Sequence, residues 1–507
     1  MANRRRGVRA AGAGLLAALA ALGGGELVAG LLRPQASPVA VVGATVIDLT
    51  PTPVKEFAVS TFGSHDKAVL VGTIVLVLLG FACLLGLLAG AGRRALAATG
   101  VAGLGLVGTA AAATRPATVP VDAVPSLVAA IVGALTLLAL VPAVPPTGGA
   151  RILPTRGRRA IPVNTRRAFL VTGTGAAAAI TTGRLLASRA PAGTLLLPPP
   201  AAPAPPLPAG TDLRVPGLGP FVTPAADFYR VDTALVVPRL LLDDWTLRVH
   251  GTRTIELTMA DVLRRGLIER DITLTCVSNE VGGPYVGNAR WLGAPLAPLL
   301  REAGIPAGSD QLLSRSADGW TAGTPVDVVM DGRDAMLAVG MNGRALPAER
   351  GFPARLVVPG LYGYVSATKW VVELRLTRYA DEHAYWTERG WAVDAPVKTM
   401  SRIDVPAPFG RLRAGAVTVA GVAWAQHRGV AGVEVRVDGG PWQEARLAAV
   451  PGPDTWRQWA WTWQATPGGH TVEVRATDAA GHTQQSSRVT PFPDGATGWH
   501  SVAVTVT

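Results

Sequence analysis

Long apolar runs, each with at most one charged residue, dominate the first 190 residues and give way to short alternating patterns after residue 210. An α-helix rises about 1.5 Å per residue, so a run of about 20 apolar residues crosses a hydrocarbon core about 30 Å thick. Such runs are predicted to form transmembrane helices at 10–32, 68–91, 95–113, 121–141 and 168–187. The pattern therefore predicts a membrane region of about five helices over residues 1–190.

The rest of the chain divides by its local pattern into three parts. Residues 191–210 are rich in Pro and Ala, which favours an extended linker because proline disrupts a helix interior. Residues 211–393 mix strand and helix patterns without a regular βαβ alternation, and an α+β domain is expected. Residues 394–507 alternate with a period of two between glycine turns, which is typical of a β-sandwich.

Individual elements can be predicted within these two folded parts. Short helices are expected at 259–265, capped by Thr258, and at 296–303. Strands of the α+β part are expected at 245–249, 271–276, 356–360 and 370–376. Strands of the sandwich are expected at 416–425, 433–437, 459–463, 472–474 and 502–506, with turns at Asp438-Gly439, Gly468-Gly469 and 478–481.

The charge is distributed unevenly along the chain, whose formal net charge is +12. Residues 1–190 carry 18 Lys and Arg against 5 Asp and Glu, whereas residues 191–507 carry 29 against 30. A nucleic-acid-binding protein would carry its positive excess on a folded surface. Here the excess lies among the apolar runs, so the class of nucleic-acid-binding proteins is excluded. Arginines cluster at 4–9, at 93–94 and at 151–167, around alternate apolar runs. The positive-inside rule then places the N-terminus in the cytoplasm and residues after 190 outside a multi-pass cell membrane.

The fifth apolar run begins with Thr165-Arg166-Arg167-Ala168-Phe169-Leu170, which resembles a twin-arginine export signal. The alternative interpretation is that these arginines only end the cluster of positive charge. The five runs contain no histidine, the usual ligand of a membrane haem. They are therefore interpreted as an anchor in membrane lipid and not as a path for electrons.

The two cysteines, Cys83 and Cys276, exclude a disulfide scaffold and any site with four cysteine ligands. The zinc-protease, serine-elbow and phosphate-loop motifs are also missing from the sequence. Cys276 ends the strand expected at 271–276. From these residues alone it is either a small buried hydrophobe or a thiolate ligand of a metal.

Around Cys276 the chain resembles the sulfite oxidase family of molybdopterin enzymes, over about 211–507. The matching segments are 227–232, 273–280, 288–293, 341–347, 350–355, 358–360 and 366–370, and in the C-terminal part 421–424 and 437–440. The resemblance implies a membrane-anchored sulfite oxidase-like molybdopterin domain followed by an immunoglobulin-like domain that forms a homodimer through 394–507.

The resemblance also implies a molybdenum–molybdopterin cofactor and a two-electron oxygen-atom transfer. Cys276 matches the metal ligand and, with Arg230, the catalytic positions. Positions that match cofactor contacts are Tyr229, Arg230, Asn279, Asp318, Arg350, Arg355, Ser366, Thr368 and Lys369. The chain has no Cys-x-x-Cys-His haem motif, so electrons would pass through a separate carrier such as a cytochrome.

The substrate side of the predicted site departs from the family pattern. Sulfite-oxidising members have arginines where this chain has Glu280 and Val281, and an acidic residue there would repel sulfite. This departure argues against sulfite, and the substrate is expected to be either sulfite or another sulfur or nitrogen oxo compound. Tyr285, Tyr362 and Tyr364 are candidate hydrogen-bond donors to it.

Two further functions remain as alternatives to the outward-facing enzyme. The first is a cell-surface binding module that keeps the fold without the cofactor, which the Trp-rich sandwich would suit. The second is a transporter, which is disfavoured because the apolar runs contain almost no internal charge for a substrate path.

Overall fold

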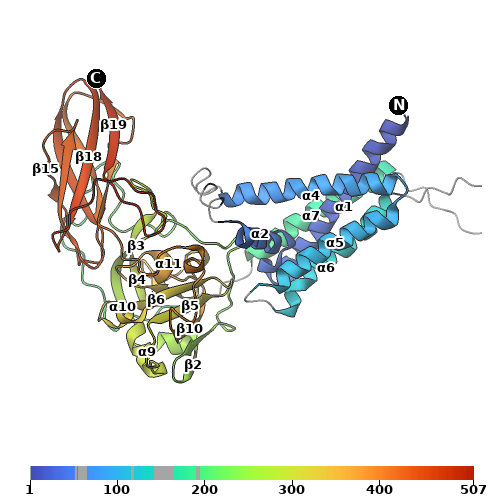
Figure 1. Ribbon diagram of the computed structural model, residues 1–507, viewed down its shortest axis with the longest axis horizontal. Helices are drawn as coiled ribbons and strands as arrows, with labels where there is room; N and C mark the ends of the chain where they lie inside the picture. The colour runs from blue at the N-terminus through green and yellow to red at the C-terminus, as the bar shows by residue number, and fades with distance from the viewer. Residues whose placement is uncertain are drawn as a thin grey trace, which may run out of the picture. The chain divides into compact units, whose positions relative to one another are not determined.

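The computed structural model describes residues 2–51, 54, 57, 66–115, 119–141, 165–189 and 195–507. The chain forms two compact units (Figure 1). The first contains Met1–Pro191 and the short segment Thr233–Arg239. The second contains Ala192–Asp232 and Leu240–Thr507.

The first unit is a bundle of apolar helices, of which α1 packs against α4, α6 and α7, and α5 packs against α6. Its long helices are α1 (Ala2–Leu32), α4 (Asp66–Gly90), α5 (Arg94–Ala113), α6 (Val124–Leu140) and α7 (Thr165–Arg189). Small residues let the backbones approach, as in membrane helix pairs. A Cβ on Gly14 of α1 would lie 2.0 Å from the carbonyl oxygen of Ala82 in α4.

Five helices are long and apolar enough to cross a membrane: Gly7–Leu32, Lys67–Gly90, Arg94–Ala113, Pro120–Leu140 and Arg167–Leu186. They agree within three residues with the runs predicted from the sequence. Arg151, Arg156, Arg158 and Arg159 of the predicted cationic cluster lie outside the described residues. Arg166 and Arg167 stand in the first turn of α7.

The sequence analysis missed one helix of this unit, because it predicted no element between the apolar runs 10–32 and 68–91. The helix α2 (Pro38–Leu49) begins at a proline, and the Ser37 side chain accepts a hydrogen bond from the Ala40 amide. Both features favour a helix start. At 12 residues α2 is too short to span a bilayer, so a search for spans overlooks it.

The first part of the second unit contains two mainly antiparallel sheets with short helices at their edges. One sheet has the strand order β2-β1-β10-β5-β6 and the other β3-β4-β7-β8, with β9 paired to β7. The strands of the first sheet are β1 (Thr246–His250), β2 (Thr254–Thr258), β5 (Gln311–Ser316), β6 (Thr321–Pro325) and β10 (Val371–Thr377). Those of the second are β3 (Ile268–Thr275), β4 (Val286–Pro295), β7 (Met336–Met341), β8 (Arg344–Ala345) and β9 (Arg355–Val357). The helices are α8 (Met259–Leu263), α9 (Leu296–Ala303), α10 (Val326–Met330) and α11 (Gly363–Ser366).

The C-terminal part is an all-β domain of two sheets, with orders β11-β13-β17-β16 and β12-β19-β18-β14-β15 (Figure 1). Alternate side chains of both sheets meet in one apolar core that includes Val419, Trp459, Val474 and Val504. The strands of the first sheet are β11 (Met400–Val405), β13 (Gly415–Trp424), β16 (Arg446–Leu447) and β17 (Arg457–Ala465). Those of the second are β12 (Arg411–Leu412), β14 (Val430–Val437), β15 (Gln443–Glu444), β18 (Gly468–Asp478) and β19 (His500–Val506).

The strongest periodic patterns predicted their elements well. Helix α9 has the expected bounds, and Thr258 caps α8 as expected through a capping box with Asp261. The turn at Asp438-Gly439 is confirmed by the left-handed φ of both residues. The turn expected at Gly468-Gly469 is wrong, because both glycines pair with β19 as the first residues of β18.

The Pro/Ala-rich linker is extended but is not a detached tether in its described part. The Ala201 amide donates to the carbonyl of Leu267, and the Ala202 carbonyl accepts from the amide of Glu269. Residues from Ala201 onward therefore lie along the start of β3, and the linker contributes to this sheet.

The buried indole of Trp459 supports a stability prediction. Trp459 is fully buried in the core of the C-terminal domain, whereas Trp442 is partly exposed. Truncation of a buried Trp leaves a large cavity and costs about 3–5 kcal/mol. We expect Trp459→Ala to lower the thermal unfolding midpoint of the full chain clearly more than Trp442→Ala, measured by circular dichroism in detergent. Equal shifts in the two variants would contradict this assignment of the core.

Candidate functional site

Cys276 follows the last residue of β3 and is buried, with 8% of its surface exposed. Its amide donates a 2.9 Å hydrogen bond to the carbonyl of Tyr285, so the chain returns toward β4 immediately beyond the thiol. The Sγ atom lies 3.0 Å from the Ser278 hydroxyl. Burial raises the pKa of the Cys276 thiol, and hydrogen bonds from the side chain and backbone of Ser278 oppose this effect.

The loop after Cys276 is closed by its own hydrogen bonds. The buried Asn279 accepts a 2.7 Å bond from the Tyr285 amide through Oδ1, and its own amide donates to the Cys276 carbonyl. The amide of Gly283 donates to the carbonyl of Glu280. Asn279, which the sequence assigned to the cofactor, thus uses its side-chain oxygen to shape the loop around the thiol.

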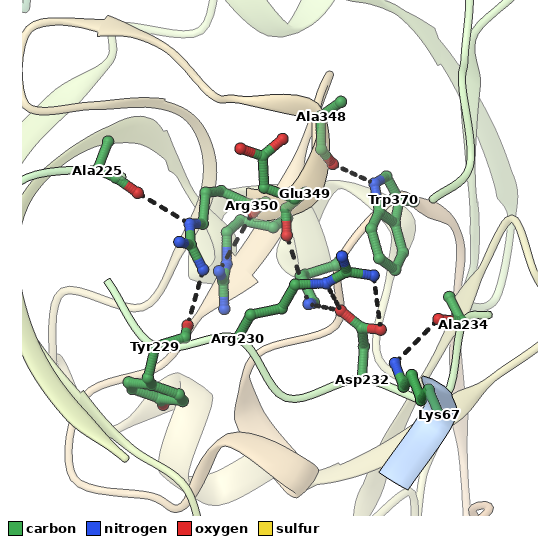
Figure 2. Close-up of polar contacts among 12 residues, drawn as sticks. Lys67, Ala225, Tyr229, Arg230, Asp232, Ala234, Ala348, Glu349, Arg350 and Trp370 are labelled. Atoms are coloured by element: carbon green, nitrogen blue, oxygen red, sulfur yellow. Dashed lines mark hydrogen bonds and ion pairs between the residues drawn. The ribbon is translucent and has the colours of Figure 1, made fainter. Parts of the chain in front are cut away.

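Arg350 holds the segment that carries Tyr229 and Arg230 (Figure 2). Its three guanidinium nitrogens donate to the carbonyl oxygens of Ala225, Ala226 and Tyr229 at 2.9–3.2 Å. These bonds use one donor from each nitrogen, so Arg350 fixes the backbone of this segment. Burial lowers the pKa of Arg350.

Arg355 is a buried cation whose hydrogen-bond acceptors, within the described part of the chain, are all carbonyl oxygens. Its guanidinium donates long bonds of 3.2–3.4 Å to the carbonyls of Leu356, Arg350 and Ala367, and lies 5.0 Å from the centre of the Trp291 ring. Among the described residues, no carboxylate lies within 4.0 Å of it. Burial lowers the pKa of Arg355 to about 10. A buried charge without a counter-charge is unfavourable, so an anion from outside the chain would fit this site.

Lys369 and Arg230 share one carboxylate, that of Asp232. Arg230 binds both carboxylate oxygens of Asp232, at 2.8 and 3.2 Å (Figure 2). The Lys369 ammonium contacts Oδ2 of the same carboxylate. Burial lowers the pKa of Lys369 to about 8, against the opposing effect of Asp232. Asp232 stood in the sequence motif at 227–232 but received no role, because the motif does not show which cations it meets.

The remaining residues predicted to contact the cofactor are Ser366, Thr368 and Asp318, and each forms different hydrogen bonds within the chain. The buried Ser366 hydroxyl donates to the carbonyls of Leu361 and Tyr362, and the buried Thr368 hydroxyl lies 2.6 Å from that of Ser314. Asp318 accepts from the Trp320 amide within a turn between β5 and β6.

The three tyrosines proposed from the sequence also differ in their contacts. Tyr285 lies with its ring centre 6.3 Å from that of Tyr229. The Tyr364 hydroxyl donates to the Ala392 carbonyl at 2.6 Å, and the Tyr362 hydroxyl accepts from the Lys398 amide at 3.4 Å. Burial raises the pKa of Tyr229 and Tyr362, with a smaller contribution from Cys276 at Tyr229 and from Asp494 at Tyr362, so both are protonated at neutral pH.

Residues of the C-terminal domain form hydrogen bonds with the end of β3, immediately before Cys276. The Thr273 amide donates to the Asp454 carbonyl, and the Thr273 hydroxyl accepts from the Trp456 amide at 2.7 Å. The buried Gln426 donates to the Thr275 hydroxyl at 2.8 Å and to the Thr273 carbonyl at 3.3 Å. The sequence analysis missed these contacts, since they join segments far apart in the chain.

The same domain also holds the loop beyond Cys276. Arg402 donates to the Gly283 carbonyl at 2.8 Å. Gly282 has φ of +80°, and a Cβ there would lie 2.3 Å from the His500 ring, so a glycine is required. The His500 Nδ1 accepts from the Ile403 amide at 3.0 Å, which fixes the ring.

The donor set near Cys276 limits how a metal could be held. Across the described ranges, no group of three or more His, Cys, Asp or Glu side chains could bind a metal ion. A metal at the Cys276 thiolate would need its other ligands from a cofactor. The buried thiol of Cys276 can ligate a metal, and the buried cation Arg355 can pair with an anion, so the two fit a metal-bearing cofactor that also carries a negatively charged group.

The environment of His500 gives a pH prediction. Burial, Arg402 and Arg488 lower its pKa to about 4, against the opposing effect of Asp404. The unfolded chain therefore binds a proton at His500 between pH 6.5 and 4 that the folded chain does not, so stability falls on acidification across this range. We expect His500→Asn to remove a loss of about 2 kcal/mol between pH 6.5 and 4.5. Thermal midpoints against pH measure this, with the exposed His482→Asn as control; an unchanged slope in His500→Asn would contradict it.

The comparisons with known proteins agree with this chemistry. Residues 234–386 match the family described as oxidoreductase molybdopterin binding domain. Sulfite oxidase of Gallus gallus is 29% identical over 321 residues, which cover 53% of this chain and 69% of that protein. Mitochondrial sulfite oxidase of Homo sapiens is 28% identical over 289 residues, 48% of this chain and 52% of that protein. The chain thus spans about half the length of the mammalian relatives it matches.

Two other proteins are similar to different shares of this chain. NADH nitrate reductase of Petunia hybrida is 27% identical over 194 residues, 32% of this chain and 21% of that protein. The solved structure of the sulfane dehydrogenase SoxCD from Paracoccus pantotrophus has 25% identity and a TM-score of 0.49, and covers 57% of this chain and 82% of that chain.

Family match and curated relatives lead to one conclusion. Residues 234–386 therefore form an oxidoreductase molybdopterin-binding domain that is similar to sulfite oxidases, and this similarity implies a molybdenum–molybdopterin cofactor.

Proposed function

We propose that this chain is a membrane-anchored, outward-facing oxidoreductase of the sulfite oxidase type, in which Cys276 ligates the molybdenum. The observation that carries the proposal is the buried Cys276 thiol at the end of β3, in a part of the chain that matches the molybdopterin-binding family. When bound, the cofactor supplies a two-electron exchange of an oxygen atom with a small oxo substrate.

The residues around Cys276 have different roles in binding the cofactor in this proposal. Arg355 faces only carbonyls, which supports a role as counter-charge to the pterin phosphate. Lys369 adds a second buried cation, and Tyr229 a protonated hydroxyl. Arg350 and Asn279 are proposed to act on the shape of the site, because their side chains bind backbone groups of the surrounding segments. Ser366, Thr368 and Asp318 remain proposals by resemblance.

The charges favour a substrate with little net charge. Arg230, the cation proposed for the substrate, is paired through two bonds with Asp232. Glu280 is exposed on the loop beyond Cys276 and adds a negative charge there. An anion such as sulfite would meet a partly neutralised cation, so a neutral sulfur or nitrogen oxide is the better substrate in this proposal.

A binding module without cofactor is the less suitable alternative. Such a protein would bury the Arg355 guanidinium among carbonyls with no anion to neutralise it. This arrangement is costly unless a ligand provides the negative charge.

The membrane part of the proposal follows from the arginine distribution and the five apolar helices. The rule that positive loops face the cytoplasm places residues after 190 on the other side. Electrons would then pass between the molybdenum site and a separate carrier. The immunoglobulin-like character of the C-terminal domain, and a homodimer formed through it, belong to the same proposal.

Metal analysis tests the ligand assignment. We expect the purified full chain to contain molybdenum near one atom per chain, and Cys276→Ser to lose most of it, because a neutral hydroxyl is a far weaker ligand than a thiolate. Cys83→Ser is the matched control, since Cys83 lies in α4. Molybdenum retained at full stoichiometry in Cys276→Ser, with a normal thermal midpoint, would refute the assignment.

Cysteine labelling in spheroplasts tests the orientation. In a Cys83→Ala background, a membrane-impermeant maleimide should label Ser487→Cys in the C-terminal domain without lysis. Ala91→Cys, between α4 and α5, should react only after the membrane is permeabilised. Both positions are exposed, so the opposite pattern would show that the domains face the cytoplasm.

A further inference from the structure

The Ser278 hydroxyl is directed at the sulfur that Cys276 offers to the metal. Its Oγ lies 3.0 Å from Sγ, and the two residues are separated by Val277 alone. Either atom of this pair could be the donor while the sulfur carries a proton. A sulfur that ligates a metal has no proton, so in the loaded protein the hydroxyl must donate.

The loop does not need this bond for its shape. Backbone and side-chain bonds already close it, from Asn279 to the Cys276 carbonyl, from Tyr285 to Asn279 Oδ1 and from Cys276 to the Tyr285 carbonyl. Arg402 holds the far end at the Gly283 carbonyl. The hydroxyl of Ser278 therefore acts on the sulfur itself.

A hydrogen bond donated to a ligand sulfur withdraws electron density from it. The sulfur then gives less charge to the metal, which stabilises the reduced state of the metal and raises its potential. We propose that Ser278 is a positioning residue that acts through Cys276 and sets the molybdenum reduction potential higher than the thiolate alone would set it. This inference rests on the proposed function, in which Cys276 is the metal ligand.

The matched variants are Ser278→Ala, which removes the donor, and Ser278→Thr, which keeps a hydroxyl at the same position. Ser486→Ala, on the exposed surface of the C-terminal domain, controls for the loss of a serine. Each variant is prepared as the full chain with its cofactor. The measurements are molybdenum content and a redox titration followed by the electron paramagnetic resonance signal of Mo(V).

We expect full molybdenum content in all variants. In Ser278→Ala the ratio of Mo(VI) to Mo(V) at a fixed potential should rise about tenfold, which for a one-electron couple is a downward shift of 59 mV. Ser278→Thr and Ser486→Ala should titrate like the unchanged protein.

Three results would overturn the inference. An unshifted titration of Ser278→Ala with full metal content would show that the hydroxyl does not act on the sulfur. Loss of molybdenum from Ser278→Ala, retained in Ser486→Ala, would show a role in metal retention instead. Absence of molybdenum from the unchanged protein would refute the proposed function, and this inference with it, whereas the first two results leave that function intact.

Discussion

The structure around the thiol depends on how the end of β3 is fixed from outside its own sheet. Thr273 donates its amide to Asp454 and accepts from the Trp456 amide, and Gln426 binds Thr275 next to Cys276. A strand end held only by its neighbour β4 would fray, because terminal ladder bonds are exposed to water. The bonds from the C-terminal domain remove that freedom. The position of Cys276 is therefore a property of both parts of the second unit.

The second constraint is buried positive charge. Lys369 and Arg230 are balanced by Asp232, whereas Arg355 has only carbonyl oxygens and the face of Trp291. Desolvation of a charge costs several kcal/mol. The buried guanidinium of Arg355 would therefore attract an anion, and the described part of the chain does not provide one. In the proposed function, the phosphate of molybdopterin provides this anion. The same reasoning separates Arg355 from Arg350, whose donors hold the backbone from Ala225 to Tyr229.

The sequence predicted those features that depend on local pattern. The apolar runs agree with the five candidate spans, and the alternating segments agree with strands such as β17 and β19. The place of Cys276 at a strand end was also foreseen. The helix α2 was missed because its apolar run is too short for a span, although Ser37 followed by Pro38 was a readable start signal.

The division of roles within the site could not be derived from the sequence. The resemblance implies that Arg350 and Asn279 contact the cofactor, but it does not show that their polar atoms bind backbone groups. Gln426 and His500 act on a segment far from them in the chain, and no periodic pattern reports such a pairing. Ser278 was open to detection, since a hydroxyl two residues from a candidate ligand can reach its sulfur.

The hydrogen bonds between the C-terminal domain and β3 have a consequence for the order of biosynthesis. Trp456 follows Thr273 by 183 residues, and its amide is needed to complete the hydrogen bonds of that strand. Until the ribosome has produced Trp456, this hydrogen bond to β3 next to Cys276 cannot form. If Cys276 ligates the metal as proposed, the cofactor would find its complete site only after the C-terminal domain has been translated and has folded against β3.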